Sequence, residues 1–439
     1  MNYSLIHYQS KERLQSIEVF ILLLGIFSSF YVNVIGQLYI SEIILILLFP
    51  FLWIRNRGVL LQERLTGRIL LFGFLWFISQ ALTDLIRATP TSDMLRGWAG
   101  IIVLLISFGS LYMLVDQKIR RIQFFILGFA MGSLIATPLQ PHPYFADEPW
   151  KFGFATPLVF LLLLFISYTC GGNIQCLKKW VMPILFWGGL TIYLNARALG
   201  TVTILMALVL WLRTRKTGEL LLTRLSVRNI IVGGLIFGLA FWGVSNIYGY
   251  AAQAGYLGEK ARWKYTQQSS GQWGLIIGGR SEILVSTRAV ADSPWIGHGS
   301  WAKNPVYRLY MYQLLIDLGY YEQSEEAIKR FIGSSDIIPT HSHLFQAWVW
   351  AGILGAVFWI VILGVLIQAF IASNRFPNPL YIFVVFITVA AVWDIFFSPF
   401  GSVMRMRWAT QLVILLTAIS KSSQIHQKMA RNSGVVVVK

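Results

Sequence analysis

Long apolar segments separated by short polar ones recur along most of the chain. A helix needs about 20 mostly apolar residues to cross a bilayer, and flanking residues bring the shorter segments to that length. Twelve segments fit this pattern: 17–34, 38–54, 69–86, 98–115, 122–136, 154–168, 181–194, 199–212, 230–244, 344–371, 380–397 and 403–419. The pattern predicts an all-α polytopic membrane protein with about twelve transmembrane helices.

One long polar interruption, residues 246–342, separates the ninth predicted helix from the tenth. It divides the chain into helices 1–9 within residues 1–245, the loop itself, helices 10–12 within 343–420, and a tail at 421–439. A membrane protein does not need so long a loop merely to connect two helices. The loop is therefore the first place to look for chemistry.

Helices are also expected inside this loop. Apolar and charged residues over 306–331 have an amphipathic helical spacing, and residues 281–291 predict a shorter helix. The tenth apolar segment, 344–371, is too long for one straight span. It is predicted to tilt or to project beyond the membrane.

Composition supports the membrane class and bears on the partners. Of the 439 residues, 56% are hydrophobic and 13% are charged, with a mean hydropathy of +0.63. A soluble chain carries about twice that fraction of charged residues. The net charge of +17 would suit nucleic-acid binding, but basic residues of membrane proteins gather on cytoplasmic loops. We therefore expect the lipid bilayer, and no nucleic acid, as a partner.

Basic residues determine the predicted orientation. With the N-terminus in the cytoplasm, 21 of the 36 basic residues fall on cytoplasmic segments and six on short outer loops. The cytoplasmic set is Lys11, Arg13, Arg55, Arg57, Arg64, Arg68, Lys118, Arg120, Arg121, Lys178, Lys179, Arg213, Arg215, Lys216, Arg224, Arg228, Arg375, Lys421, Lys428, Arg431 and Lys439. Both termini are therefore predicted to be cytoplasmic, and the long loop to face outward.

Two further features concern the compartment. Cys170 and Cys176 lie near a predicted cytoplasmic end, where thiols stay reduced, and are expected to form neither a disulfide nor a metal site. Residues 1–16 precede the first apolar segment without a small-residue cleavage site. The first helix is therefore expected to stay in the membrane.

Arg280 is the first candidate for chemistry, because it follows two glycines and opens the predicted helix 281–291. Glycine permits a tight turn, and a helix N-terminus with an arginine attracts phosphate. Arg288 lies about two helical turns further on. The alternative is that both arginines pair with loop carboxylates such as Glu282 and Asp292.

Other basic residues at predicted outer ends are candidates too. Arg197 directly precedes the eighth predicted helix, where it would reach either an outer cavity or the lipid headgroups. Arg405 and Arg407 would likewise reach an outer cavity or the lipid headgroups, or would pair with a carboxylate such as Asp394. Lys151, in a proline-rich outer loop, is a further candidate for substrate binding.

His341 and His343 flank Ser342 just before the tenth predicted helix. Imidazole is the usual general base near neutral pH. Alternate residues of an extended segment point to opposite sides, so one histidine of the pair is expected to face an outer cavity. The sequence contains no HExxH spacing, Walker loop or dinucleotide-binding loop. Neither a metal nor another cofactor is therefore expected.

Three short motifs and the position of the long loop resemble the O-antigen ligase and polymerase superfamily of bacterial envelope glycosyltransferases. The motifs are the run 195–200, Gly279-Arg280 with the run 293–299, and the run 341–344 with Gly352 and Gly355. They are similar to the family's Ser-Arg-Gly-type start of a span, its Gly-Arg and Pro-x-x-Gly-x-Gly element, and its His-Asn…Gly-x-x-Gly element. Leu344 replaces the family's Asn and Ala198 its Gly, which leaves ligase and polymerase both open.

The resemblance implies a glycosyltransferase of the bacterial inner membrane with a periplasmic active site. A glycan on undecaprenyl pyrophosphate would be transferred with inversion to a lipid A-core sugar in a ligase, or to another glycan chain in a polymerase. Arg280 and Arg197 would hold the pyrophosphate, and His343 would take the proton from the acceptor hydroxyl. The candidates for substrate binding are Arg288, His341 and Lys151.

A transporter of lipid-linked glycans is the alternative from another functional class. Transport needs charged residues deep inside the spans. The acidic residues Glu18, Glu42, Asp84 and Asp394 instead lie near predicted span ends. The long outer loop is also better explained by an enzyme.

Overall fold

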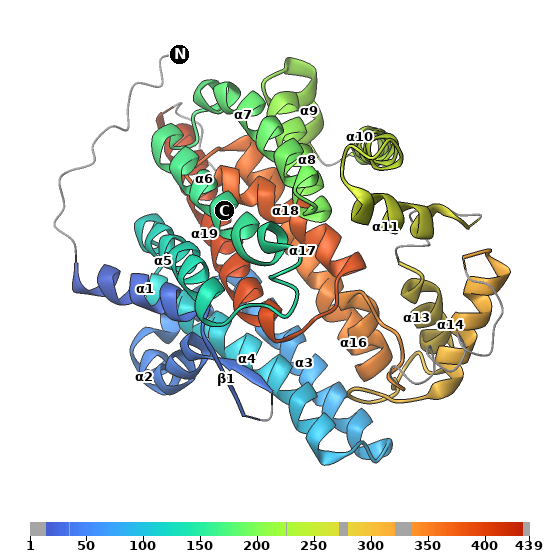
Figure 1. Ribbon diagram of the computed structural model, residues 1–439. Coiled ribbons are helices and arrows are strands. Elements are labelled where there is room, and N and C mark those ends of the chain that lie inside the picture. Colours follow the sequence, from blue (N-terminus) through green and yellow to red (C-terminus); the bar gives the residue numbers. More distant parts are fainter. Residues whose placement is uncertain (1–14, 35, 225, 272–279, 321–335, 433–439) are drawn as a thin grey trace.

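The protein is a bundle of α-helices with one small pair of strands (Figure 1). The computed structural model describes residues 15–34, 36–224, 226–271, 280–320 and 336–432. Seven of the described helices are long and apolar enough to cross a membrane, or eight if two helices joined at a 112° bend form one span. The predicted class, an all-α membrane protein, is confirmed.

Each of the twelve predicted segments contains a helix. Before the long loop the helices are α1 (Ser16–Phe27), α2 (Ile40–Gln62), α3 (Arg64–Ile86), α4 (Thr91–Val115), α5 (Ile119–Leu139), the π-helix η1 (Trp150–Phe154), α6 (Ala155–Cys170), α7 (Ile174–Tyr193), α8 (Arg197–Arg213), α9 (Lys216–Thr223) and α10 (Val227–Gln253). After it begins they are α11 (Glu259–Ser269), α13 (Glu282–Asp292), α14 (Pro305–Asp317), α16 (His343–Ala351), α17 (Ile353–Arg375), α18 (Tyr381–Phe397) and α19 (Ser402–Asn432).

The first predicted span is shorter than expected. Its helix, α1, ends at Phe27, and the chain then forms an antiparallel hairpin of β1 (Tyr31–Asn33) and β2 (Gln37–Tyr39). The aromatic and β-branched residues after Phe27 favour extended backbone, which the apolar count alone does not register. The side-chain amide of Gln140, after α5, bonds both backbone groups of Tyr31 and holds the hairpin in place.

α1 and α5 pack closely because small residues line their contact. A Cβ at Gly25 of α1 would collide with the backbone of α5. The same holds in reverse for Gly128 and Gly132 of α5, which are four residues apart and face the backbone of α1. Such spacing of small residues lets membrane helices approach until their backbones touch.

The tenth predicted segment is two helices rather than one tilted helix. α16 and α17 are separated by Gly352, which has φ 69° and ψ −161°. A Cβ at this residue would collide with the carbonyl of Trp295 in the long loop. The break therefore results from a contact with a distant part of the chain, and the prediction of a single tilted or projecting helix is wrong.

The ends of several helices that carry the predicted cytoplasmic residues meet at one end of the bundle. Arg213 donates from Nε to the carbonyl of Asn374 at 3.1 Å, and its Nη1 lies 3.0 Å from Glu219. The amide of Asn378 donates to Ser422 Oγ at 3.0 Å. These contacts join the ends of α8, α9, α17 and α19. The basic residues at these ends are the ones predicted to be cytoplasmic.

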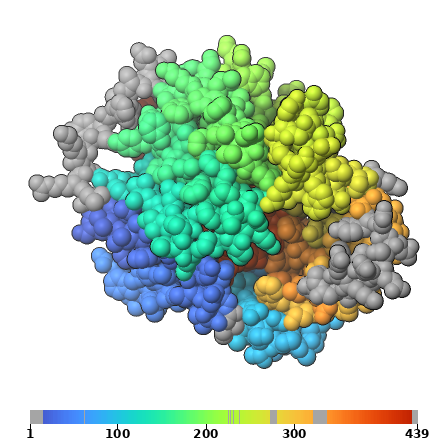
Figure 2. Space-filling model, viewed as in Figure 1, coloured from blue at the N-terminus to red at the C-terminus, as the bar shows by residue number. Residues whose placement is uncertain are grey.

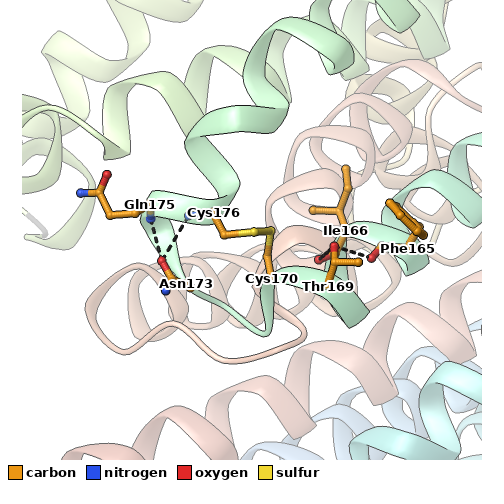
Figure 3. Close-up of a disulfide and its surroundings, with 7 residues drawn as sticks. All are labelled: Phe165, Ile166, Thr169, Cys170, Asn173, Gln175 and Cys176. Atoms are coloured by element: carbon orange, nitrogen blue, oxygen red, sulfur yellow. Dashed lines mark hydrogen bonds between the residues drawn. A yellow bond between two sulfur atoms is a disulfide. The ribbon is translucent and has the colours of Figure 1, made fainter. Parts of the chain in front are cut away.

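Cys170 and Cys176 form a disulfide across the turn between α6 and α7 (Figure 3). Gly171 and Gly172 both have positive φ, and the side chain of Asn173 caps the first turn of α7. This tight turn places the two Cα atoms 5.4 Å apart, within the range that a disulfide spans. The prediction of two unpaired thiols is therefore wrong, because it considered the compartment and not the geometry of the turn.

The helices of the long loop lie beside the bundle in Figure 1. α10 continues to Gln253, so the loop begins later than residue 246. The predicted helix over 281–291 is confirmed as α13. Of the predicted helix over 306–331, the structure shows α14 ending at Asp317, and residues 321–331 lie outside the described residues.

Candidate functional site

The loop that follows α13 is held against the end of α16. The peptide N–H groups of His298 and Gly299 donate to the carbonyls of Val349 at 2.7 Å and Trp350 at 3.1 Å. Gly297 and Gly299 have φ values of +86° and +94°, which side chains other than glycine rarely adopt. The glycines of the Pro-x-x-Gly-x-Gly element therefore have a structural role, which is to fix the end of α13 beside α16.

The same loop is bound to the end of α3 by two charged residues. Arg87 donates from Nε to the Gly297 carbonyl at 3.0 Å and from Nη2 to Ser293 Oγ at 2.9 Å. The buried carboxylate of Asp84 accepts from the Ser300 N–H at 2.6 Å and the Ser300 hydroxyl at 2.7 Å. From the sequence, Asp84 was placed near a span end but given no part in building the site.

Arg280 directly precedes α13, and its guanidinium lies 5.8 Å from the centre of the Trp393 ring on α18. Burial lowers the pKa of Arg280, the nearby carboxylate of Glu282 opposes this shift, and the positive charge of Arg197 adds to it. Arg197 and Arg280 are therefore close enough for their charges to interact. Two neighbouring guanidinium groups form a place where an anion is favoured. Gly279, the first residue of the Gly-Arg motif, lies outside the described residues.

Arg197 is the first residue of α8 and is held by one residue of α10 and one of α11. Its guanidinium lies 5.0 Å from the centre of the Tyr248 ring on α10. Its Nη1 donates to the side-chain carbonyl of Gln268 on α11 at 3.3 Å. A cation held by an aromatic ring and an amide keeps its full charge. This arrangement suits an anionic ligand better than an arginine paired with a carboxylate would.

His341 lies in the short segment before α16, where the charge of Arg280 acts on it. Burial lowers the pKa of His341, Glu282 raises it, and Arg280 lowers it again. The resulting pKa is below its usual value, so the imidazole is neutral at pH 7 and able to accept a proton. His341 is only partly buried, so part of its side chain is accessible at the surface of the protein.

His343 is the first residue of α16 and is completely buried. Its Nδ1 lies 2.6 Å from the carbonyl oxygen of Ser398, which can only accept, so Nδ1 carries the proton. Nε2 is then the acceptor of the neutral ring. The rings of Trp359, Phe400 and Trp408 surround the imidazole, with centres 4.8, 5.6 and 5.8 Å away.

The side chain of Ser398, whose carbonyl binds His343, is held by an ion pair. Ser398 donates from Oγ to Asp394 Oδ1 at 2.9 Å, and Arg407 Nη2 lies 3.1 Å from Asp394 Oδ2. Of the alternatives considered for Arg407, the structure shows the pairing with Asp394. Arg405 pairs instead with the buried carboxylate of Glu42, at 2.7 Å. Both arginines therefore have a structural role.

Two of the candidate substrate-binding residues are paired with carboxylates. Arg288 Nε lies 3.2 Å from Asp292 Oδ1, as in the alternative considered for the loop arginines. Lys151 Nζ lies 2.9 Å from Glu148 Oε2. Arg280 is within electrostatic range of both Arg197 and His341.

Glu148 is a residue of this region that the sequence analysis did not single out. Its buried carboxylate accepts hydrogen bonds from Lys151 at 2.9 Å, Lys264 at 2.7 Å and the amide of Asn195 at 2.8 Å, and Lys260 lies 3.8 Å away. Burial raises the pKa of Glu148, but the hydrogen bonds and charges of Lys264 and Lys151 outweigh burial and lower the pKa to about 2. The sequence signal for this cluster is the i, i+4 spacing of Lys260 and Lys264, which places both lysines on one face of a helix.

Figure 2 shows a hollow on the surface of the protein between the teal part, the yellow helices α10 and α11, and the orange part of the long loop. Within the described residues no group of three or more His, Cys, Asp or Glu side chains could hold a metal ion. No protein-family model matches the chain, and a search of curated proteins finds no match.

Proposed function

We propose that the protein is a glycosyltransferase of the bacterial inner membrane that moves a glycan from undecaprenyl pyrophosphate to an acceptor hydroxyl. The observation that carries this proposal is that Arg197 lies against Tyr248 and Gln268 rather than against a carboxylate. Arg280 is close enough to act electrostatically on both Arg197 and His341. Two partly desolvated cations suit a pyrophosphate, and a neutral imidazole beside them suits a hydroxyl that must lose its proton. We propose the O-antigen ligase reaction, in which the acceptor is a sugar of the lipid A core.

In this reaction the acceptor oxygen bonds to C1 of the first sugar while the bond from C1 to the pyrophosphate oxygen breaks. Attack from the opposite side inverts C1. The bonding electron pair leaves with the pyrophosphate, where Arg197 and Arg280 neutralise the developing charge. The proton of the acceptor hydroxyl passes to a histidine. The proposed reaction needs no metal or other cofactor.

Both histidines are candidates for the base. The resemblance implies His343, and the hydrogen bond from its Nδ1–H to Ser398 supports this role because it leaves Nε2 able to accept a proton. Access favours His341, because His343 is completely buried among aromatic rings whereas His341 is partly exposed beside Arg280. We keep Arg288 and Lys151 as proposed substrate-binding residues. In this role the positive charge of each side chain would attract a negative group of the substrate.

The proposal includes twelve spans, cytoplasmic termini and a periplasmic site. The gathering of the basic helix ends of α8 and α17 at one end of the bundle supports this topology. Disulfides form in oxidising compartments. The Cys170–Cys176 disulfide alone would therefore place the turn between α6 and α7 on the periplasmic side. We keep the orientation set by charge because it rests on 21 basic residues rather than on one turn.

Purified protein tests the proposal directly. Supplied with a lipid-linked glycan and lipid A core, it should release undecaprenyl pyrophosphate in the presence of a chelator. Arg280→Gln should slow transfer about a hundredfold, because a charge on the leaving group is no longer neutralised. Arg262→Gln is the matched control, since Arg262 is exposed on α11 and pairs with Glu259 at 3.6 Å. Transfer that is equal in both variants would contradict the arginine assignment.

The two histidines are separated by single substitutions. Removing the base should slow transfer by about a hundredfold or more while donor binding persists. If only His341→Ala has this effect, the base is His341 and the implied role of His343 is wrong. If neither His341→Ala nor His343→Ala slows transfer, a histidine base is excluded.

A deletion strain separates the ligase from the alternatives. A ligase mutant accumulates complete polymer on undecaprenyl pyrophosphate, whereas a polymerase mutant accumulates single repeat units. A transporter would instead move lipid-linked glycan across liposomes that contain no acceptor. The engagement of buried Glu42 and Asp84 in fixed hydrogen bonds favours an enzyme over a transporter.

A further inference from the structure

The loop before α6 presents an aromatic surface on the outer side. The rings of His142 and Phe152 stack with centres 4.3 Å apart and planes 5° apart. Tyr144 lies 5.6 Å from His142 and 5.7 Å from Phe152, and 60% of Tyr144 is exposed. Burial and the charge of Lys151 both lower the pKa of His142, so its ring is neutral and behaves as an aromatic face. Flat exposed rings of this kind pack against the apolar C–H face of a sugar.

Positive charge adjoins this surface. Lys151 Nζ lies 4.5 Å from the centre of the Phe152 ring, so an ammonium group borders the aromatic stack. Lys151, Lys260 and Lys264 share a single carboxylate, that of Glu148. Three ammonium groups around one carboxylate leave two positive charges in excess. The local charge therefore favours a ligand that carries a negative group.

This region is physically connected to the proposed active site. Asn195, which bonds Glu148, lies two residues before Arg197 in the chain. Gln268, which bonds Arg197, lies one helical turn after Lys264 on α11. A sugar bound here would be close to a pyrophosphate held by Arg197.

We propose that His142, Tyr144 and Phe152, together with Lys151, Lys260 and Lys264, form a subsite for an acidic sugar residue of the glycan substrate. The inference rests on the proposed glycosyltransferase function. The aromatic rings contact the sugar ring, and the ammonium groups pair with its carboxylate. Lys260 and Lys264 lie on α11, whose residues are mostly polar and which borders the hollow of Figure 2. A sugar in that hollow therefore fits better than the headgroup of a membrane lipid.

Binding of a free oligosaccharide tests the subsite without requiring transfer. The full-length protein is placed in nanodiscs of phosphatidylcholine and titrated by calorimetry with trigalacturonate and with maltotriose. Trigalacturonate should bind about tenfold more tightly, since only it carries carboxylates that pair with lysines. Its affinity should fall as salt is raised. Equal affinities of the two trisaccharides would overturn the proposal.

Matched variants locate the binding. Tyr144→Ala and Lys260→Gln should each weaken trigalacturonate binding about threefold to tenfold, by loss of a ring contact or an ion pair. Tyr168→Ala and Lys179→Gln are the controls, because Tyr168 and Lys179 are exposed near the opposite ends of α6 and α7. Equal effects of test and control variants would refute the location.

Three further outcomes have distinct meanings. If the protein lacks transfer activity but trigalacturonate binding follows these variants, the subsite stands and the proposed enzyme function fails. If transfer proceeds but trigalacturonate binds no better than maltotriose, the enzyme stands and the subsite fails. If phosphatidylglycerol in the nanodisc weakens trigalacturonate binding as much as Tyr144→Ala does, the surface is a lipid contact and the proposal is overturned.

Discussion

Gly352→Ala is expected to destabilise the protein, because residue 352 has no room for a Cβ and no other residue suits its backbone. With φ 69° and ψ −161°, Gly352 has a conformation that is almost confined to glycine. Forcing alanine into this region costs about 1 to 3 kcal/mol. The added Cβ would also collide with the carbonyl of Trp295, so the loop after α13 would have to move.

Moving that loop endangers two backbone hydrogen bonds. His298 donates to Val349 at 2.7 Å and Gly299 donates to Trp350 at 3.1 Å. Each is worth about 1 kcal/mol. Together with the backbone strain, Gly352→Ala should therefore cost roughly 3 to 5 kcal/mol.

Thermal unfolding in detergent, followed by tryptophan fluorescence, measures this effect. For a chain of this length each kcal/mol corresponds to roughly 1 °C, so the midpoint should fall by about 3 to 5 °C. Gly364→Ala is the matched control in α17, because a Cβ at Gly364 meets open space. Alanine there should be neutral or stabilising by up to about 1 kcal/mol. Equal midpoints for the two variants would show that the glycine break does not depend on the contact with Trp295.

Three other changes test separate parts of the structure. Arg405→Met should lower the free energy of unfolding by about 3 to 5 kcal/mol, because Glu42 is left buried and unpaired. Adding Glu42→Gln should recover part of this stability, and no recovery would contradict the pairing. Glu148 has a pKa depressed from 4.5 to about 2, so it stabilises the fold above pH 4.5 and this contribution is lost as the pH falls toward 2. The difference in midpoint between wild type and Glu148→Gln should therefore shrink between pH 6 and pH 3, and a constant difference would refute the charge assignment. Cys170→Ser should cost roughly 2 kcal/mol because the disulfide is lost, and dithiothreitol should lower the wild-type midpoint by the same amount. A wild-type midpoint unchanged by dithiothreitol would contradict the stabilising role of the disulfide.

The helices could be predicted from the sequence because each apolar segment carries its own signal. The apolar run at 69–86, for instance, coincides with α3, which ends at Ile86. The helix after Arg280 was likewise visible as a local pattern and is confirmed as α13. Helix formation depends on neighbouring residues, so a single sequence contains most of the required information.

Other features depend on contacts between distant residues and could not be predicted in this way. The break at Gly352 results from Trp295, which is more than fifty residues away. The attachment of the long loop to α3 depends on Asp84 and Ser300, which are joined only in the folded chain. The disulfide depends on the turn geometry at Gly171 and Gly172, which the compartment argument ignored.

The nature of each arginine's partner separates structural arginines from candidate functional ones. Arg405 and Arg407 are paired with Glu42 and Asp394, so their charges are already neutralised within the protein. Arg197 instead lies against an aromatic ring and donates to an amide, and these partners leave its positive charge available to an incoming anion. All of these arginines occupy similar positions at predicted outer ends of helices. Their sequence positions therefore could not separate them, whereas the chemistry of their partners does, and it favours Arg197 as the candidate for binding an anion.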